Sequence, residues 1–73
     1  MDKTQKQTMV QGHKVFYSQD AQDGVNYLVR LSRDEAKVYF DQAYLKGTAS
    51  FEDHMAKNFK LTKKNYDFEL TRI

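Results

Sequence analysis

The stretch from Ser32 to Gly47 constrains the fold most, because it has the start, the apolar face and the end that a helix needs. Ser32 is a residue type that accepts hydrogen bonds from the first free backbone N–H groups of a helix, and Glu35 can bond back to the N–H of Ser32. Gly47 suits the left-handed turn that ends many helices. The sequence therefore predicts one main helix over residues 33–46.

The periodicity of this helix predicts which of its faces is buried. At about 100° per residue, its small and aromatic side chains gather on one face, where alanines would let aromatic rings approach a sheet closely. We expect this face to pack in the core. It comprises Ala36, Tyr39, Phe40, Ala43 and Tyr44.

The chain before the helix indicates two strands. Residues 9–17 are rich in β-branched and aromatic side chains, and 13–17 has the composition of a strand end. The polar segment 18–24 ends in Asp-Gly, a common turn signal. Apolar residues then alternate through 25–31, which is typical of a half-buried strand. We expect these two strands to form an antiparallel hairpin.

The chain after the helix is ambiguous around residues 50–57. Apolar spacing there fits a short second helix, whereas residues 49–53 and 59–62 can also be strands joined by a turn. We favour the strand interpretation. Alternation over residues 66–71 then predicts a terminal strand.

These elements predict a small α+β domain with an antiparallel sheet, in the order β-β-α-β-β, and one main helix (33–46) packed on it. A fifth strand or a short second helix around 50–57 is the alternative to this order. Residues 1–8 are polar and lack periodicity, so we expect a flexible tail before a single domain of residues 9–73. The 73 residues include no cysteine, so without disulfides the core must rely on apolar packing alone or be completed by a partner chain.

The chemical groups of the chain do not predict catalysis. His13 and His54 lack neighbouring ligands at metal-binding spacing, and no cysteine or strained serine turn offers a nucleophile. The three glycines are isolated, so no phosphate-binding loop is expected. We predict a protein that is not an enzyme and has no metal, no cofactor and no small-molecule substrate.

The sequence also lacks an apolar run long enough for a signal peptide or a membrane span. We therefore expect a cytoplasmic protein with no membrane partner. The net charge of +2 is small, and neither requires nor excludes an anionic partner.

The outer face of the main helix is the first candidate binding surface. Two apolar residues lie there in line with two acids, although the predicted core does not need them. This combination favours a small non-enzymatic binding module, accessory or regulatory, that contacts another protein or a second copy of itself. The candidate partner-binding residues are Asp34, Val38, Asp41 and Leu45.

The basic and aromatic stretch 54–66 supports an alternative function. Lysines mixed with aromatic rings can neutralise phosphates and stack on bases, so sequence-nonspecific nucleic-acid binding is the second hypothesis. Solvated lysines on a strand face would explain the same pattern without any ligand. The candidate nucleic-acid-binding residues are Lys57, Lys60, Lys63, Lys64 and Tyr66.

Overall fold

The computed structural model describes residues 5–73, which form a five-stranded sheet and two α-helices. The predicted α+β class is confirmed. A second helix lies at residues 22–30, where the sequence predicted a turn and a strand. In chain order the elements are β1 (Lys6–Val10), β2 (His13–Tyr17), a 3-10 helix (Gln19–Ala21), α1 (Gln22–Arg30), α2 (Arg33–Lys46), β3 (Thr48–Glu52), β4 (Asn58–Lys64) and β5 (Asp67–Arg72).

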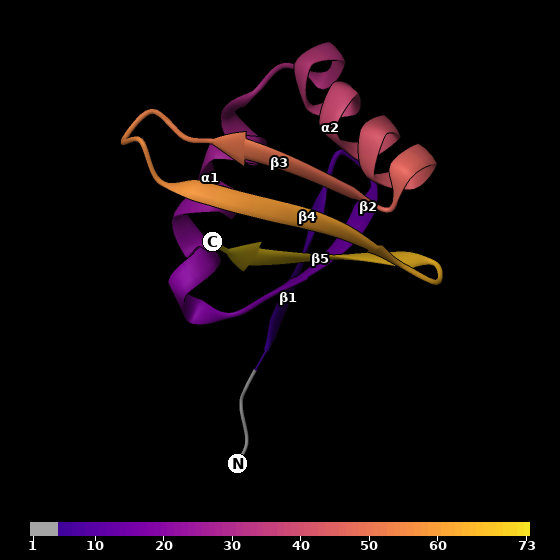
Figure 1. Ribbon diagram of the computed structural model, residues 1–73, viewed down its shortest axis with the longest axis horizontal. Helices are drawn as coiled ribbons and strands as arrows, with labels where there is room; N and C mark the ends of the chain where they lie inside the picture. The colour runs from indigo at the N-terminus through magenta and orange to yellow at the C-terminus, as the bar shows by residue number, and fades with distance from the viewer. Residues whose placement is uncertain (1–4) are drawn as a thin grey trace.

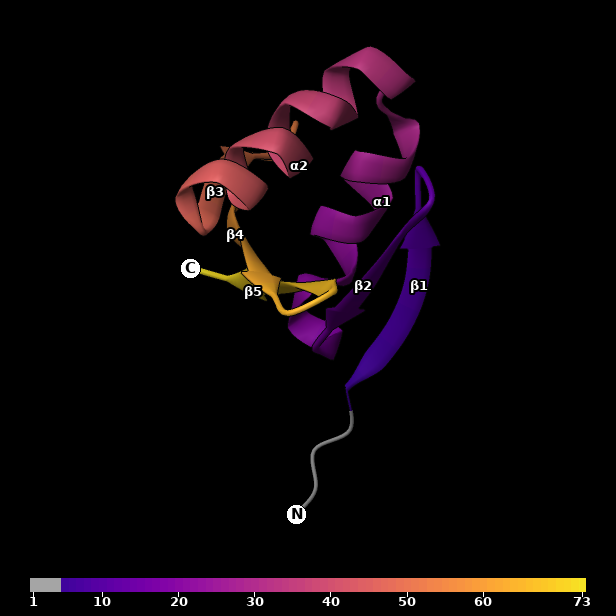
Figure 2. The same ribbon diagram turned by 90° about the vertical axis from the view of Figure 1, so that its right-hand side faces the viewer.

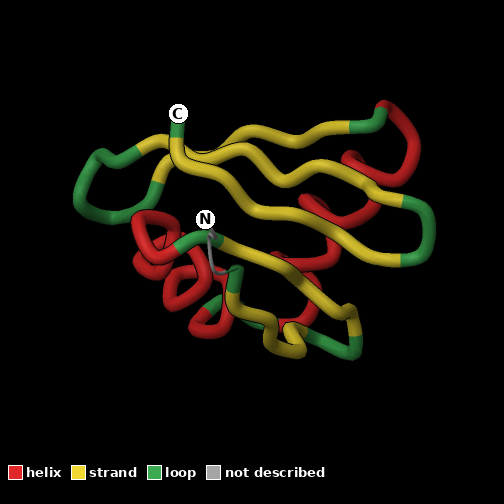
Figure 3. The backbone as a smooth tube through the Cα atoms, turned by 90° about the horizontal axis from the view of Figure 1, so that it is seen from below, coloured by secondary structure: helices red, strands yellow, loops and turns green. Residues whose placement is uncertain are grey.

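The sheet has the strand order β1-β2-β5-β4-β3, in which an N-terminal hairpin joins a C-terminal three-stranded meander. All neighbours are antiparallel except β2 and β5, which pair in parallel over residues 15–17 and 68–70. Figure 3 shows the hairpin and the meander as two groups of strands. Both helices lie on the same side of the curved sheet (Figures 1 and 2), so the other side carries no helix within residues 5–73.

The core lies between the helices and the inner face of the sheet. Every strand and both helices contribute buried apolar residues, and the largest include the four phenylalanines Phe40, Phe51, Phe59 and Phe68. Aromatic rings contact one another across elements: the ring centroids of Phe40 and Phe68 are 4.9 Å apart, and those of Phe51 and Phe59 are 5.6 Å apart. This aromatic packing gives a short chain a large buried apolar area.

The predicted strand at residues 25–31 is wrong, because this segment belongs mainly to α1. Alternation of apolar residues suggested a strand, but the buried positions of this region are Ala21, Gly24, Val25 and Leu28, which repeat every three or four residues as in a helix. Val29, which the strand interpretation placed inside, is 55% exposed. The predicted hairpin therefore does not form, and β2 pairs with β1 instead.

The predicted Asp-Gly turn is also wrong, since Asp23 and Gly24 lie in the first turn of α1. The glycine is explained by packing. A Cβ atom at position 24 would lie 2.8 Å from ring carbons of Phe59 and 3.0 Å from a methyl of Leu70. Only glycine lets α1 approach β4 and β5 this closely.

The predicted N-terminal tail extends too far, because residues 6–8 belong to β1, where Lys6 is aligned with Tyr17. The side chains of this edge strand are mostly polar and exposed, so no hydrophobic pattern marks it; backbone pairing with β2 holds it in the sheet. Residues 1–4 of that predicted tail lie outside the described residues.

The helix predicted at residues 33–46 is confirmed with both of its ends. The Ser32 hydroxyl accepts a hydrogen bond from the Glu35 backbone N–H at 3.2 Å, and the Glu35 carboxylate accepts one from the Ser32 N–H, also at 3.2 Å. Gly47 ends the helix at a φ of 92°. Ala36, Phe40 and Ala43 are buried as predicted.

Two tyrosines of the predicted inner face differ from this pattern. Tyr39 is half-buried at the edge of the core, and Tyr44 is 68% exposed, which corrects its assignment to the core. Tyr44 lies in the last turn of α2, and its ring contacts the ammonium of Lys63, with 5.5 Å between the nitrogen and the ring centroid.

The strand interpretation of residues 50–57 is confirmed, and the alternative short helix does not form. β3 covers most of 49–53, a loop follows, and β4 includes 59–62. Buried residues alternate with exposed ones in both strands, as a sheet with one covered face requires. The terminal strand predicted at 66–71 is β5, shifted by one residue. Neither helix of the described chain is long and apolar enough to cross a membrane.

Candidate functional site

The outer face of α2 brings the four predicted partner-binding residues together on one exposed stripe. We call Asp34, Val38, Asp41 and Leu45 the α2 stripe. Val38 is 60% exposed and Leu45 is 79% exposed, so neither contributes substantially to the core. These two apolar side chains remain in contact with solvent although the inner face of the same helix is fully packed.

A groove between the two helices continues this surface. It has a volume of about 210 Å³ and borders Val38 of the α2 stripe. Tyr39 contributes to its wall, and partial burial raises the pKa of the Tyr39 phenol above its usual value of 10.0, with Tyr27 adding to the effect. The groove is lined by Tyr27, Leu31, Glu35, Val38 and Tyr39.

The charges of the α2 stripe are partly neutralised from within α2. The Lys37 ammonium donates a hydrogen bond to the Asp41 carboxylate at 2.6 Å, one helical turn away. This hydrogen bond and the negative charge of Asp41 raise the pKa of Lys37 above 10.5. Asp34 is therefore the acid of the α2 stripe that forms no ion pair with residues 5–73. The other two residues of the stripe, Val38 and Leu45, are uncharged.

The predicted nucleic-acid-binding residues are not brought together. Lys57 lies in the loop before β4 and is bound to Asp23 of α1, whereas Lys63 lies near the other end of β4. The Lys63 ammonium lies near the covered side of the sheet, 5.7 Å from the ring centroid of Phe68. Tyr66, at the tip of the β4–β5 turn, is 96% exposed.

Only Lys60 and Lys64 of that set share a surface. Both alternate with buried residues of β4, which places them on the side of the sheet opposite the helices. Lys64 lies 3.6 Å from a carboxylate oxygen of Glu69 on β5, which reduces the free positive charge of this face.

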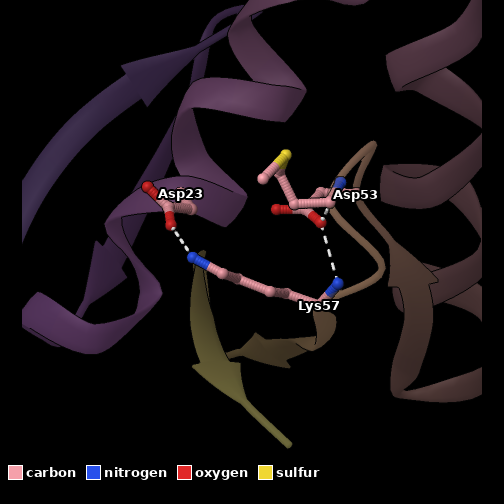
Figure 4. Close-up of polar contacts among 4 residues, drawn as sticks. Asp23, Asp53 and Lys57 are labelled. Atoms are coloured by element: carbon pink, nitrogen blue, oxygen red, sulfur yellow. Dashed lines mark hydrogen bonds and ion pairs between the residues drawn. The ribbon is translucent and has the colours of Figure 1, made fainter.

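The β3–β4 loop is shaped by the buried carboxylate of Asp53. One of its oxygens accepts hydrogen bonds at 2.9 Å from the backbone N–H groups of Met55 and Lys57. The Lys57 ammonium in turn donates a hydrogen bond to Asp23, so this loop is fastened to α1 (Figure 4). That hydrogen bond and the positive charge of Lys57 lower the pKa of Asp23 below its usual value of 3.8. All these contacts have a structural role.

The described chain contains no group of three or more His, Cys, Asp or Glu side chains placed to hold a metal ion. The two histidines are on different parts of the fold. His13 stacks on Phe40, with 4.4 Å between ring centroids, and His54 is exposed in the β3–β4 loop.

The side of the groove formed by α1 and its C-cap residue was not predicted from the sequence. Tyr27 and Leu31 were assigned to a strand, so the groove beside Val38 was not predicted. The three- and four-residue spacing of Ala21, Val25 and Leu28 was the signal that could have identified α1. Comparison of the chain with known protein families, with curated proteins and with solved structures finds no match.

Proposed function

We propose that this protein is a small non-enzymatic binding module that contacts a protein partner through the α2 stripe and the adjoining groove. The observation that carries the proposal is the exposure of Val38 and Leu45 beside a concave apolar surface. Apolar and tyrosine side chains at the centre of a patch, with charges around them, are typical of protein interfaces. An accessory or regulatory role is consistent with a module of this size.

The partner expected for this surface is apolar at its centre. It would place an apolar side chain in the groove, against Tyr27, Leu31 and Val38, and a second one over Leu45. Removing Val38 and Leu45 from water in this way is favourable by about 1.5–3 kcal/mol for each fully buried side chain. A second copy of this chain and a different protein both meet this description.

The test is the double variant Val38→Asp with Leu45→Asp, which places two charges on the α2 stripe. We expect the far-ultraviolet circular dichroism of the folded protein to be retained, while a partner recovered by the wild type is lost or a dimer becomes a monomer in light scattering. The matched control is Met9→Asp with Ile73→Asp, which makes the same chemical change at exposed apolar residues away from α2. This control should behave as wild type.

Identical partner profiles and identical masses for the wild type and the Val38→Asp, Leu45→Asp variant would contradict the proposal. The α2 stripe would then be ordinary protein surface, since isolated exposed apolar residues are common on monomers.

Nucleic-acid binding is the second candidate, and the uncovered side of the sheet favours it. Phe16 and Lys14 alternate with buried residues of β2 and so share this side with Lys60 and Lys64. A sheet face with an aromatic ring and lysines can bind single strands by stacking and phosphate contacts. Binding of a labelled oligonucleotide at low salt should weaken steeply with added salt and be lost in Lys60→Glu with Lys64→Glu; the absence of any low-salt binding would rule it out.

A further inference from the structure

A second concave site lies between the β1–β2 turn and the first half of α2. Its volume is about 330 Å³, within the range that holds small ligands. It lies on the side of α2 that faces the hairpin, and the α2–α1 groove described above shares none of its lining residues. The cavity is lined by Gln11, His13, Arg33, Lys37, Phe40 and Asp41.

The charged side chains that line this cavity, Arg33, Lys37 and Asp41, carry a net charge of +1. Lys37 and Asp41 compensate each other through their 2.6 Å contact. Arg33 forms no ion pair with the acids of residues 5–73, so its guanidinium is the uncompensated cation. A guanidinium presents several N–H donors in a planar fork that matches the two oxygens of a carboxylate.

The remaining walls are ordered by aromatic packing. The His13 ring lies nearly parallel to that of Phe40, with an interplanar angle of 20°, and meets the edge of Phe68 at a centroid distance of 5.3 Å. These contacts hold an imidazole at the cavity, where it can donate an N–H hydrogen bond. The lining of the cavity is more apolar than polar, so carbon atoms of a ligand can pack against it.

We propose that this cavity binds a carboxylate group carried on a short carbon chain, with Arg33 as the main anchor and His13 and Gln11 as further hydrogen-bonding groups. A singly charged anion matches the single uncompensated cation, whereas a phosphate dianion would require a second one. The carboxylate can belong to a free organic acid or to a glutamate or aspartate side chain of another protein. This site goes beyond the proposed function, which uses the α2 stripe and shares only Asp41 with the cavity.

The experiment is a titration of the full chain followed by ¹H–¹⁵N NMR. The probes are butyrate, with the neutral butyramide for comparison, and a blocked Leu-Glu-Leu peptide, with Leu-Gln-Leu for comparison. We expect saturable shifts of the amides of Gln11, His13 and Arg33 with the acids alone. Arg33→Gln should weaken this binding roughly tenfold, as loss of a charge-assisted hydrogen bond predicts. Lys46→Gln, which removes one positive charge from the other end of α2, should bind as wild type.

The two sources of the carboxylate give different results. Tighter binding of butyrate indicates a free acid, and tighter binding of the glutamate peptide indicates a protein side chain; either supports the site. Equal shifts with the neutral amides, or unchanged binding by Arg33→Gln, would overturn it. The Val38→Asp, Leu45→Asp variant should retain butyrate binding, so failure of the α2 stripe and failure of this cavity can be distinguished.

Discussion

At the scale of single residues, the position of α1 depends on a residue without a side chain. Gly24 reduces helix stability intrinsically, because glycine is about 1 kcal/mol less favourable than alanine inside a helix. Its position is explained by the ring of Phe59, which leaves no room for a Cβ atom at position 24. The sequence alone presented this glycine as a turn residue, and only the packing of α1 on β4 reveals its role.

We predict that Gly24→Ala destabilises the protein although alanine favours helices. The new Cβ would lie 2.8 Å from Phe59, and forcing atoms into a packed core costs about 1–3 kcal/mol. Urea denaturation measures this loss. Asn26→Ala, at an exposed position of the same helix, is the control and should be neutral or slightly stabilising. A Gly24→Ala protein more stable than wild type would show that the close approach is absent.

The Asp23–Lys57 contact gives a prediction about acid stability. The pKa of Asp23 is lower in the folded protein than its usual 3.8, so the carboxylate stabilises the fold above that pH. This contribution is lost as the pH falls through the folded-state pKa. In urea denaturation, the stability difference between wild type and Asp23→Asn should therefore be constant near neutral pH and shrink below about 3.8. A difference that does not change with pH would contradict this account.

At the scale of elements, a helix or strand could be predicted from the sequence where the residues that stabilise it lie close together in the chain. Ser32 and Glu35 bond to each other and Gly47 supplies the left-handed turn, so both ends of α2 could be predicted from the sequence. α1 has no side-chain hydrogen bond at its N-cap Ala21, and the apolar residues of 25–31 alternate in the sequence as they would in a strand. β1 was missed for a related reason, because an exposed edge strand of mostly polar residues depends on its neighbour and has no pattern of its own.

The N-cap of α2 is itself testable. Ser32→Ala removes the hydroxyl that accepts the Glu35 N–H, and loss of such a cap costs about 0.5–2 kcal/mol. The free energy of unfolding from urea titration should fall by this amount, and Ser32→Asp, which can also accept the bond, should restore most of it. Full stability in Ser32→Ala would mean that α2 is fixed by tertiary packing alone.

At the scale of the whole molecule, the fold class followed from the sequence but the topology did not. The parallel pairing of β2 with β5 joins segments at opposite ends of the chain, and nothing local encodes it. The candidate site likewise has one part that could be predicted from the sequence and others that could not. The α2 stripe follows from the periodicity of one helix, whereas the groove against α1 and the cavity against the hairpin arise where separate elements meet. The lysines of 54–66 appeared to form one surface only because they are close in sequence.

We expect the two faces of α2 to have separate roles: the inner face stabilises the fold, and the outer face is free for a partner. The free energy of unfolding of Val38→Gln with Leu45→Gln tests this most directly, because glutamine keeps the helix propensity while removing both apolar groups. We predict a value within about 0.5 kcal/mol of wild type, as for surface substitutions in general. A loss of about 2 kcal/mol or more would show that Val38 and Leu45 stabilise the fold itself, and would contradict their assignment to an interface.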